Sequence, residues 1–290
     1  TINGSVTGAE IMSLGNINAN KVTFDGDRIV LDINRLVTNG EQMVAGNIIV
    51  NTSNKDNIVL GYDAYDEEKG YEYTDEDEDT YKNNKNTVIA TVNGVSFTKE
   101  NGYMWVKTLD QLQAMNTNLA GNYALNDSID AIPTNEWNGG KGFKSIGSIG
   151  EEENPFTGKF DGLDYNIFGL TINLDGEENV GLFGYTDGAT INNVTLVAGN
   201  ITGGDNVGSV VGYAKNTNIS NVTNSVEVSG NSNVGGVVGK FESEDGSNEL
   251  KNIVNIGVTK GYASVGGIAG NMNGGKLTGQ SYNLGAVTGI

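Results

Sequence analysis

A glycine-rich motif recurs at nearly constant spacing in residues 179–290 and limits the folds open to this chain. Each copy has Val-Gly followed by a short apolar stretch and a further glycine, and the four copies begin at Asn179, Asn206, Asn233 and Ser264. The steps from valine to valine are 27, 27 and 31 residues. A period of this length is typical of solenoids rather than of closed globular folds.

Each repeat is predicted to form three short strands in one turn of the solenoid. The apolar stretches are short, rich in β-branched residues and bounded by Gly and Asn, which favours strands over helices. Sharp bends between strands favour glycine, so the motif glycines are predicted to occupy the corners. These corner residues are Gly181, Gly208, Gly235 and Gly266. The many asparagines predict amide ladders from coil to coil, and the extra residues 242–247 of the third repeat predict an outward loop.

The region before the repeats shows similar strands and one helix. Strands are predicted at 22–24, 29–33, 48–50, 88–92 and 95–97. Residues 108–116 predict a short amphipathic helix packed on the solenoid wall, because Thr108 is a favourable N-cap and the apolar residues share one face. These are Leu109, Leu112, Met115 and Leu119.

We expect one continuous solenoid with three regions. Residues 1–102 are predicted to form a β-helical shaft with an acidic insertion at 63–86. Residues 103–178 contain the helix and transitional coils, and 179–290 form four glycine-rich coils of 27–31 residues. Both ends of the chain lie in mid-pattern, so we expect that more protein flanks it on each side.

Composition excludes several classes of function. With 17 basic and 36 acidic side chains, the net charge of −19 repels phosphate backbones and anionic lipids, so neither nucleic acid nor a membrane is expected as a partner. The chain contains no histidine and no cysteine. It therefore cannot build a serine–histidine or cysteine–histidine triad, a His- or Cys-ligated zinc site, or a disulfide.

The repeats resemble a known family. The Val-Gly motif is similar to the GLUG repeat of large bacterial surface proteins, which also occurs outside the catalytic part of some immunoglobulin A peptidases. The order of features resembles filamentous-haemagglutinin-type adhesins exported by two-partner secretion: the Leu112-Gln113-Ala114-Met115 helix, then 121–131, then 156–162, then the repeats. The likeness covers 103–290, and in the shaft region it is best at 26–32. Relatives often carry histidine where this chain has Asp164-Tyr165, so no site is transferred there.

The resemblance implies an all-β, right-handed parallel β-helix that is secreted or held on a bacterial surface. Its function would be that of a non-catalytic adhesin segment, acting as a shaft and a binding surface. The implied partners are a host-cell or bacterial-surface glycan or protein, together with an outer-membrane two-partner transporter for the full-length protein. Two alternatives stay open: a β-helical polysaccharide hydrolase or lyase, and the accessory region of a surface peptidase.

The acidic insertion contains the candidate ligand-binding residues. Asp75, Asp77 and Asp79 alternate in a way that offers oxygen ligands to calcium, but Thr80 and Asn86 stand where an EF-hand loop needs glycine and glutamate. A solvated loop is favoured over a metal site, and no other cofactor is expected. Tyrosine is common in binding loops, and the tyrosines of this segment form a candidate ligand surface: Tyr62, Tyr65, Tyr71, Tyr73 and Tyr81.

Two other pairs of residues are candidates, one for catalysis and one for the hydrophobic core. Asp161 and Asp164 could serve glycoside cleavage, although a carboxylate pair in so acidic a chain is more often a surface feature. Trp105 and Trp137 flank the predicted helix and are expected in the core, because large aromatic side chains contribute most when buried.

Overall fold

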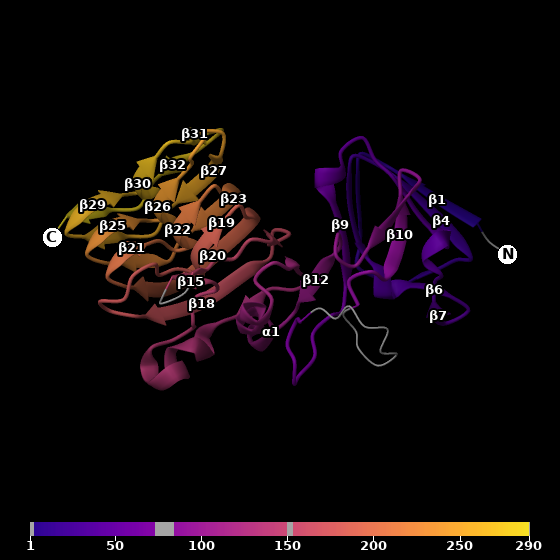
Figure 1. The fold of residues 1–290 in the computed structure, drawn as a ribbon, viewed down its shortest axis with the longest axis horizontal. Coiled ribbons are helices and arrows are strands. Elements are labelled where there is room, and N and C mark those ends of the chain that lie inside the picture. Colours follow the sequence, from indigo (N-terminus) through magenta and orange to yellow (C-terminus); the bar gives the residue numbers. More distant parts are fainter. Residues whose placement is uncertain (1–2, 73–83, 150–152, 290) are drawn as a thin grey trace. The chain divides into compact units, whose positions relative to one another are not determined.

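The computed structural model describes residues 3–72, 84–149 and 153–289 (Figure 1). Its sheets consist mainly of short parallel strands, which confirms the predicted β-solenoid. The chain forms two compact units. Unit 1 comprises Thr1–Trp105 and Gly121–Ala124, and unit 2 comprises Val106–Ala120 and Leu125–Ile290. In the described part of the chain, no helix is long and apolar enough to cross a membrane.

The strands of unit 1 confirm all five strands predicted there. They are β1 Asn3–Thr7, β2 Glu10–Ser13, β3 Ile17–Asn18, β4 Lys21–Asp25, β5 Arg28–Asp32, β6 Leu36–Thr38, β7 Glu41–Gln42, β8 Ile48–Asn51, β9 Ile58–Tyr62, β10 Val88–Val92 and β11 Val95–Thr98. Most residues of β12 Tyr103–Val106 and β13 Asn122–Leu125 also belong to unit 1, whereas Val106 and Leu125 belong to unit 2. Short 3-10 turns occupy η1 Ile33–Arg35, η2 Ala45–Asn47 and η3 Lys55–Asn57.

Unit 1 coils its strands into stacked parallel rows. One row has the order β1-β4-β8-β10-β11 and a second begins β2-β5-β9-β12-β13. The β10–β11 pair is antiparallel, because Asn93 and Gly94 both take positive φ and close a two-residue hairpin turn. Phe24 and Leu31, from adjacent strands, are both 0% exposed and belong to the core that the coils enclose.

Unit 2 contains the helix and the glycine-rich repeats. Its first elements are α1 Leu109–Ala114, η4 Met115–Thr117, β14 Ile129–Asp130, η5 Ile132–Gly140, β15 Ser148–Ile149, β16 Glu153–Asn154, β17 Lys159–Asp161 and β18 Asn166–Asn173. The repeats supply β19 Phe183–Asp187, β20 Thr190–Thr202, β21 Asp205–Val207, β22 Val211–Lys215, β23 Asn218–Asn224, β24 Glu227–Ser229, β25 Ser232–Gly235, β26 Val238–Glu242, β27 Glu249–Asn255, β28 Thr259–Gly261, β29 Ala263–Gly266, β30 Ala269–Asn273, β31 Lys276–Thr278, β32 Tyr282–Asn283 and β33 Val287–Gly289.

The second and third glycine-rich repeats each have four short strands, and the expectation of three was wrong. Strands β25, β26, β27 and β28 make one coil, and each pairs in parallel with its counterpart one coil away (Figure 1). The segment that opens each repeat was predicted as one strand. In the third repeat it forms two strands, because the chain bends between Gly235 and Val238. Residues 243–248 lie between β26 and β27 with Glu244 and Asp245 exposed. This confirms an outward loop, which begins one residue later than predicted because Glu242 belongs to β26.

The motif valines stack as the repeat predicts. Val180, Val207, Val234 and Val265 pair in register from coil to coil. The first three are at most 1% exposed, whereas Val265, in the last repeat, is half-buried. This column of side chains fixes the register of the coils, since a slip of one residue would turn it outward.

The motif glycines lie at the bends, but for a different physical reason than positive φ. The left-handed conformation belongs to the residue before each motif valine: Asn179, Asn206, Asn233 and Ser264 have φ between 51° and 59°. The glycines after the valines are needed for close approach. A Cβ on Gly208 would lie 2.6 Å from the amide nitrogen of Gly239, and one on Gly181 would lie 2.7 Å from the carbonyl oxygen of Gly208.

Asparagine ladders connect the coils, as predicted. On one side Asn206 donates to Asn179 at 2.9 Å and Asn233 donates to Asn206 at 2.8 Å. A second ladder is in the interior, where Asn224 donates to Asn255 at 2.8 Å and Asn255 donates to Asn283 at 2.7 Å. Asn224 and Asn255 are both 0% exposed, so their amides take part in the cohesion of the core.

Replacing Asn255 with alanine is expected to lower the free energy of unfolding by about 2 kcal/mol. The Asn255 side chain accepts from the Gly257 amide at 3.1 Å and donates to the Gly257 carbonyl at 3.0 Å. Its loss removes the side-chain donor of the buried Gly257 carbonyl and leaves the Gly257 amide with only its longer bond of 3.3 Å to the Asn224 carbonyl. Urea unfolding followed by circular dichroism measures the change. Asn200→Ala is the matched control at an exposed position and should change stability by less than about 0.5 kcal/mol. Equal stability of the two variants would contradict a structural role for the interior ladder.

Candidate functional site

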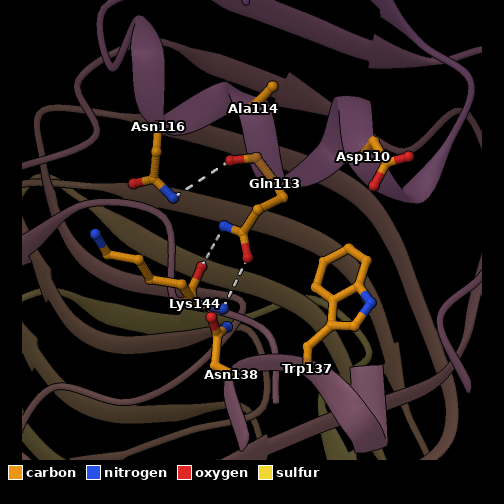
Figure 2. Close-up of a pocket in the computed structure, with 7 residues that line it drawn as sticks. All are labelled: Asp110, Gln113, Ala114, Asn116, Trp137, Asn138 and Lys144. Carbon is orange, nitrogen blue, oxygen red and sulfur yellow. Dashed lines mark hydrogen bonds between the residues drawn. The ribbon is translucent and has the colours of Figure 1, made fainter. Parts of the chain in front are cut away.

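A pocket of about 570 Å³ opens beside helix α1 in unit 2. Its lining comes from two segments that lie outside the glycine-rich repeats. The lining residues are Asp110, Gln113, Ala114, Asn116, Trp137, Asn138 and Lys144 (Figure 2). All of them belong to one compact unit, so the pocket is a property of that unit alone.

Helix α1 positions the first wall, and it confirms the predicted amphipathic helix. The Thr108 hydroxyl accepts from the Gln111 amide at 3.2 Å, which is the expected N-cap. Leu112 and Met115 are 0% exposed and hold the apolar face in the core. The opposite face therefore presents Asp110 and Gln113 at the pocket.

Amide side chains lock this helix to the segment that carries Lys144. Gln113 donates to the Lys144 carbonyl at 2.8 Å and accepts from the Lys144 amide at 2.8 Å. Asn116 adds a donation to the Ser145 carbonyl at 3.3 Å and accepts from the Gly147 amide at 3.1 Å. These side-chain amides bond to backbone groups as a neighbouring strand would, and they hold the floor of the pocket in place.

The second wall is the end of η5. Its backbone leaves helical geometry at Trp137, and Asn138 and Gly139 then take φ values of 52° and 69°. Asn and Gly tolerate this left-handed conformation, so the sequence Trp-Asn-Gly-Gly ends the turn and leaves the indole at the surface. The Asn138 amide donates to the Gly142 carbonyl at 2.7 Å and fixes the bend.

Trp137 corrects one sequence expectation, whereas Trp105 confirms the other. Trp105 is 1% exposed and belongs to the core of unit 1, as predicted. Trp137 is only half-buried and lines the pocket. The run of glycines after it is the sequence signal that indicated a turn, and a tryptophan at a turn is a better candidate for a surface than for a core.

The predicted tyrosine surface is wrong for two of its members. Tyr62 and Tyr71 are 1% and 0% exposed. Tyr71 packs edge-on against Tyr123 with ring centroids 5.0 Å apart, and its hydroxyl donates to the Trp105 carbonyl at 2.8 Å. Because the hydroxyl finds a partner inside, the ring can be buried despite its acidic neighbours. The beginning of the predicted 63–86 insertion is therefore anchored in the core, and Tyr65 is half-buried with its ring 5.5 Å from that of Tyr71.

The remaining candidates of the acidic insertion lie outside the described residues. These are Tyr73 and Tyr81 of the predicted surface and Asp75, Asp77 and Asp79 of the calcium hypothesis. The solvated loop therefore stays the prediction, with calcium binding as its alternative.

Asp161 and Asp164, the candidate pair for glycoside cleavage, take part in local structural contacts. Asp161 accepts from the Leu163 amide at 2.9 Å and from the Asn193 side chain at 2.8 Å. It therefore begins a further asparagine ladder, which Asn193, Asn221 and Asn252 continue. Asp164 sits in the tight turn that follows, with φ of 63°.

An aromatic and charged row on β19, β22 and β26 is the other notable surface. Tyr185 stacks on Tyr213 with centroids 5.1 Å apart, and the Lys240 ammonium lies 4.3 Å from the centroid of the Tyr213 ring. Tyr213 and Lys240 both bind Glu242, at 3.2 and 3.0 Å. Burial, and then the charge of Asp187, raises the pKa of Tyr185 to about 12. Glu242 thus pairs with both polar neighbours and the two rings stack across adjacent coils, which indicates cohesion between coils rather than a site for a ligand.

The raised pKa of Tyr185 predicts a loss of stability in alkali. Its folded pKa exceeds the value near 10 of an exposed tyrosine, so the contribution is complete below about pH 10 and is lost as the pH rises toward about 12. Thermal melting across this interval, with tyrosinate absorbance as the second readout, measures the effect. Tyr185→Phe should melt with a smaller alkaline decrease than the wild type. An equal decrease in both would assign the loss to other groups.

Comparison with known proteins gives one sequence relative and one structural likeness. No family model matches the chain. A stretch of 144 residues is 38% identical to halomucin of Haloquadratum walsbyi and covers 48% of this chain. The match covers 2% of halomucin, so the chain corresponds to a small part of a far longer protein. A candidate immunoglobulin A1 protease from Bacteroides ovatus aligns in structure with a TM-score of 0.42 and 15% identity, over 61% of this chain and 68% of that one.

Proposed function

We propose that this chain is a non-catalytic β-solenoid segment of a large secreted or cell-surface protein, where it acts as a shaft and displays binding surfaces for adhesion. The observation that carries the proposal is the 38% identity to halomucin over about half of a chain that folds as a solenoid. The chain spans about 2% of halomucin. The role of the full-length protein that contains this chain is therefore part of what we propose.

The physical basis of the shaft is the repetition of one coil. Each coil pairs with the next at the strand spacing of about 4.8 Å and buries the same valine column and amide ladders. Length is thus gained by repetition, without a new core for each coil. Stacked coils of this kind suit a protein that must hold a binding surface away from a cell.

In its finer form the proposal is a GLUG-containing adhesin of the filamentous-haemagglutinin type. The support is the order of the helix, the transitional coils and the glycine-rich repeats along this sequence. The full-length protein would then pass through an outer-membrane two-partner transporter and bind a glycan or a protein on a host or neighbouring cell.

Localisation in the source organism tests the proposal. Antibodies raised against the purified chain should label intact cells or the culture fluid, and protease treatment of intact cells should remove the label. Antigen found only after lysis would contradict a surface or secreted location.

Turnover tests the non-catalytic part separately. The purified chain should retain glycans without releasing reducing ends or unsaturated products. Product release would instead favour a polysaccharide hydrolase or lyase.

A further inference from the structure

We propose that the pocket beside helix α1 binds an uncharged pyranose unit of a glycan, with the Trp137 indole as the stacking surface and Asp110 as the hydroxyl acceptor. This inference deepens the proposed function by assigning the class of ligand to one site. It rests on three properties of the pocket: an aromatic face left open, polar groups that the protein does not use, and a rigid frame.

The open aromatic face is the first property. Trp137 is half-buried and faces a pocket of about 570 Å³, whereas Trp105 is 1% exposed in a core. A large aromatic side chain contributes most to stability when it is fully buried, so folding alone gives little reason to leave this one at a pocket wall. A flat apolar surface of this size matches the C–H face of a pyranose ring.

The unused polar groups are the second property. Within the part of the chain that the structure describes, the Asp110 carboxylate, the Lys144 ammonium and the Asn138 side-chain oxygen have no hydrogen-bond or ion-pair partner. A carboxylate only accepts hydrogen bonds, and adjacent sugar hydroxyls can donate to both of its oxygens. The amide oxygen of Asn138 accepts a further hydroxyl, and the ammonium donates to one.

The arrangement of these groups suits a ligand that spans the pocket. Figure 2 shows Asp110 and Trp137 on one side of the Gln113 side chain and Lys144 on the other. A ring stacked on the indole would therefore meet the carboxylate first, while Lys144 is placed to reach a neighbouring sugar unit. This geometry fits an oligosaccharide better than a single small ion.

The rigid frame is the third property. Gln113 ties α1 to the Lys144 backbone by two bonds of 2.8 Å, and Asn138 ties the second wall to the Gly142 carbonyl at 2.7 Å. Both walls are therefore held before binding. Preorganisation of this kind lowers the entropy lost when a weak ligand is ordered.

Charge selects an uncharged ligand. The pocket itself carries one carboxylate and one ammonium, but the chain as a whole carries a net charge of −19, which repels acidic sugars and other anions. A quaternary ammonium ligand would favour an aromatic cage of several rings. Here Trp137 is the one aromatic residue among those lining the pocket, so the flat sugar ring fits better.

Binding by the purified 290-residue chain tests the inference. The probes are neutral oligosaccharides of glucose, galactose, mannose and N-acetylglucosamine, with sialyllactose and choline as charged probes. Saturation-transfer NMR and tryptophan fluorescence should detect at least one neutral probe with a dissociation constant on the order of 1 mM or below. Trp137→Ala should weaken that binding by about tenfold or more, and Asp110→Asn by about threefold to tenfold.

Matched variants separate the site from general effects on the fold. Tyr262→Ala removes an aromatic side chain that is 64% exposed on another coil, and Asp175→Asn removes an exposed carboxylate outside the pocket. Both should bind the probe as the wild type does. Trp137→Phe keeps an aromatic face, so it should retain more affinity than Trp137→Ala, and melting curves verify that each variant is folded.

Three results would overturn the inference: no neutral probe bound at tens of millimolar, binding that survives Trp137→Ala in a folded protein, or preference for choline or sialyllactose. None of these results bears on the cellular location of the full-length protein, which the antibody experiment measures. The experiments therefore test sugar binding by the pocket and the proposed surface role separately.

Discussion

Replacing Val234 with aspartate is expected to lower the free energy of unfolding by about 3 to 5 kcal/mol. Val234 is 0% exposed, and its register partners on both sides are Val207 and Val265. The backbone is close on the remaining sides, since a Cβ on Gly261 would lie 2.7 Å from the Val234 Cγ2 methyl. A carboxylate at this position would lose its water and gain no cation. Thermal and urea unfolding should both show the loss, at about 2 to 4 °C in melting temperature per kcal/mol.

Two further valine variants show whether the effect comes from the column. Val265→Asp stands at the same register position in the last repeat, where the side chain is half-buried, so its cost should be smaller. Val287→Asp, at a position 44% exposed, should change stability by less than about 0.5 kcal/mol. A Val234→Asp protein that melts at the wild-type temperature would show that the column is assigned to the wrong register.

The parts of the fold that repeat could be predicted from the sequence. A residue type that returns every 27 positions must occupy the same place in successive coils, so the period by itself pairs Val207 with Val234. The same logic predicted amide ladders, and Asn206 and Asn233 form one. Periodicity supplies the long-range contact that a single sequence otherwise lacks.

The number of strands in each coil could not be predicted in the same way. The sequence shows that Gly235 recurs, but not whether it serves a left-handed φ or a close approach of two backbones. The neighbouring Asn233 takes the left-handed position, and Gly235 allows the bend that divides one predicted strand into β25 and β26. Both residue types tolerate turns, so composition alone could not separate their roles.

The candidate pocket was missed because its walls do not repeat. Asp110 and Gln113 come from the helix, whereas Trp137 and Asn138 come from a bent 3-10 segment some 25 residues later. The contact between the two walls depends on the Gln113 amide bonding to the Lys144 backbone, and no sequence period indicates such a bond. For Tyr71 the acidic composition around it predicted an exposed side chain, but the residue is buried. Its hydroxyl donates to the Trp105 carbonyl inside the core, and no sequence pattern indicates that bond.

Replacing Gly235 with alanine is expected to destabilise unit 2 by about 3 kcal/mol, at the upper end of the usual cost of overpacking. The added methyl would overlap the Val238 carbonyl oxygen and lie 2.7 Å from the Gly270 amide nitrogen and 2.8 Å from the Ile268 carbonyl oxygen. All three are backbone atoms, and they belong to this coil and to the next. The methyl can be accommodated only if paired coils separate, which breaks the strand pairing between β26 and β30.

The matched control for Gly235→Ala has the opposite sign. Among the described residues other than its chain neighbours, nothing lies within 4 Å of a Cβ on Gly289, and its φ is outside the left-handed region, so Gly289→Ala adds a methyl group without a steric clash there. Alanine also restricts the unfolded chain more than glycine does, so this variant should be as stable as the wild type or more stable by up to about 1 kcal/mol. Urea unfolding of both variants measures the difference. If Gly235→Ala were also neutral, the close approach of the two backbones would be wrong, and the glycine would serve only the local bend.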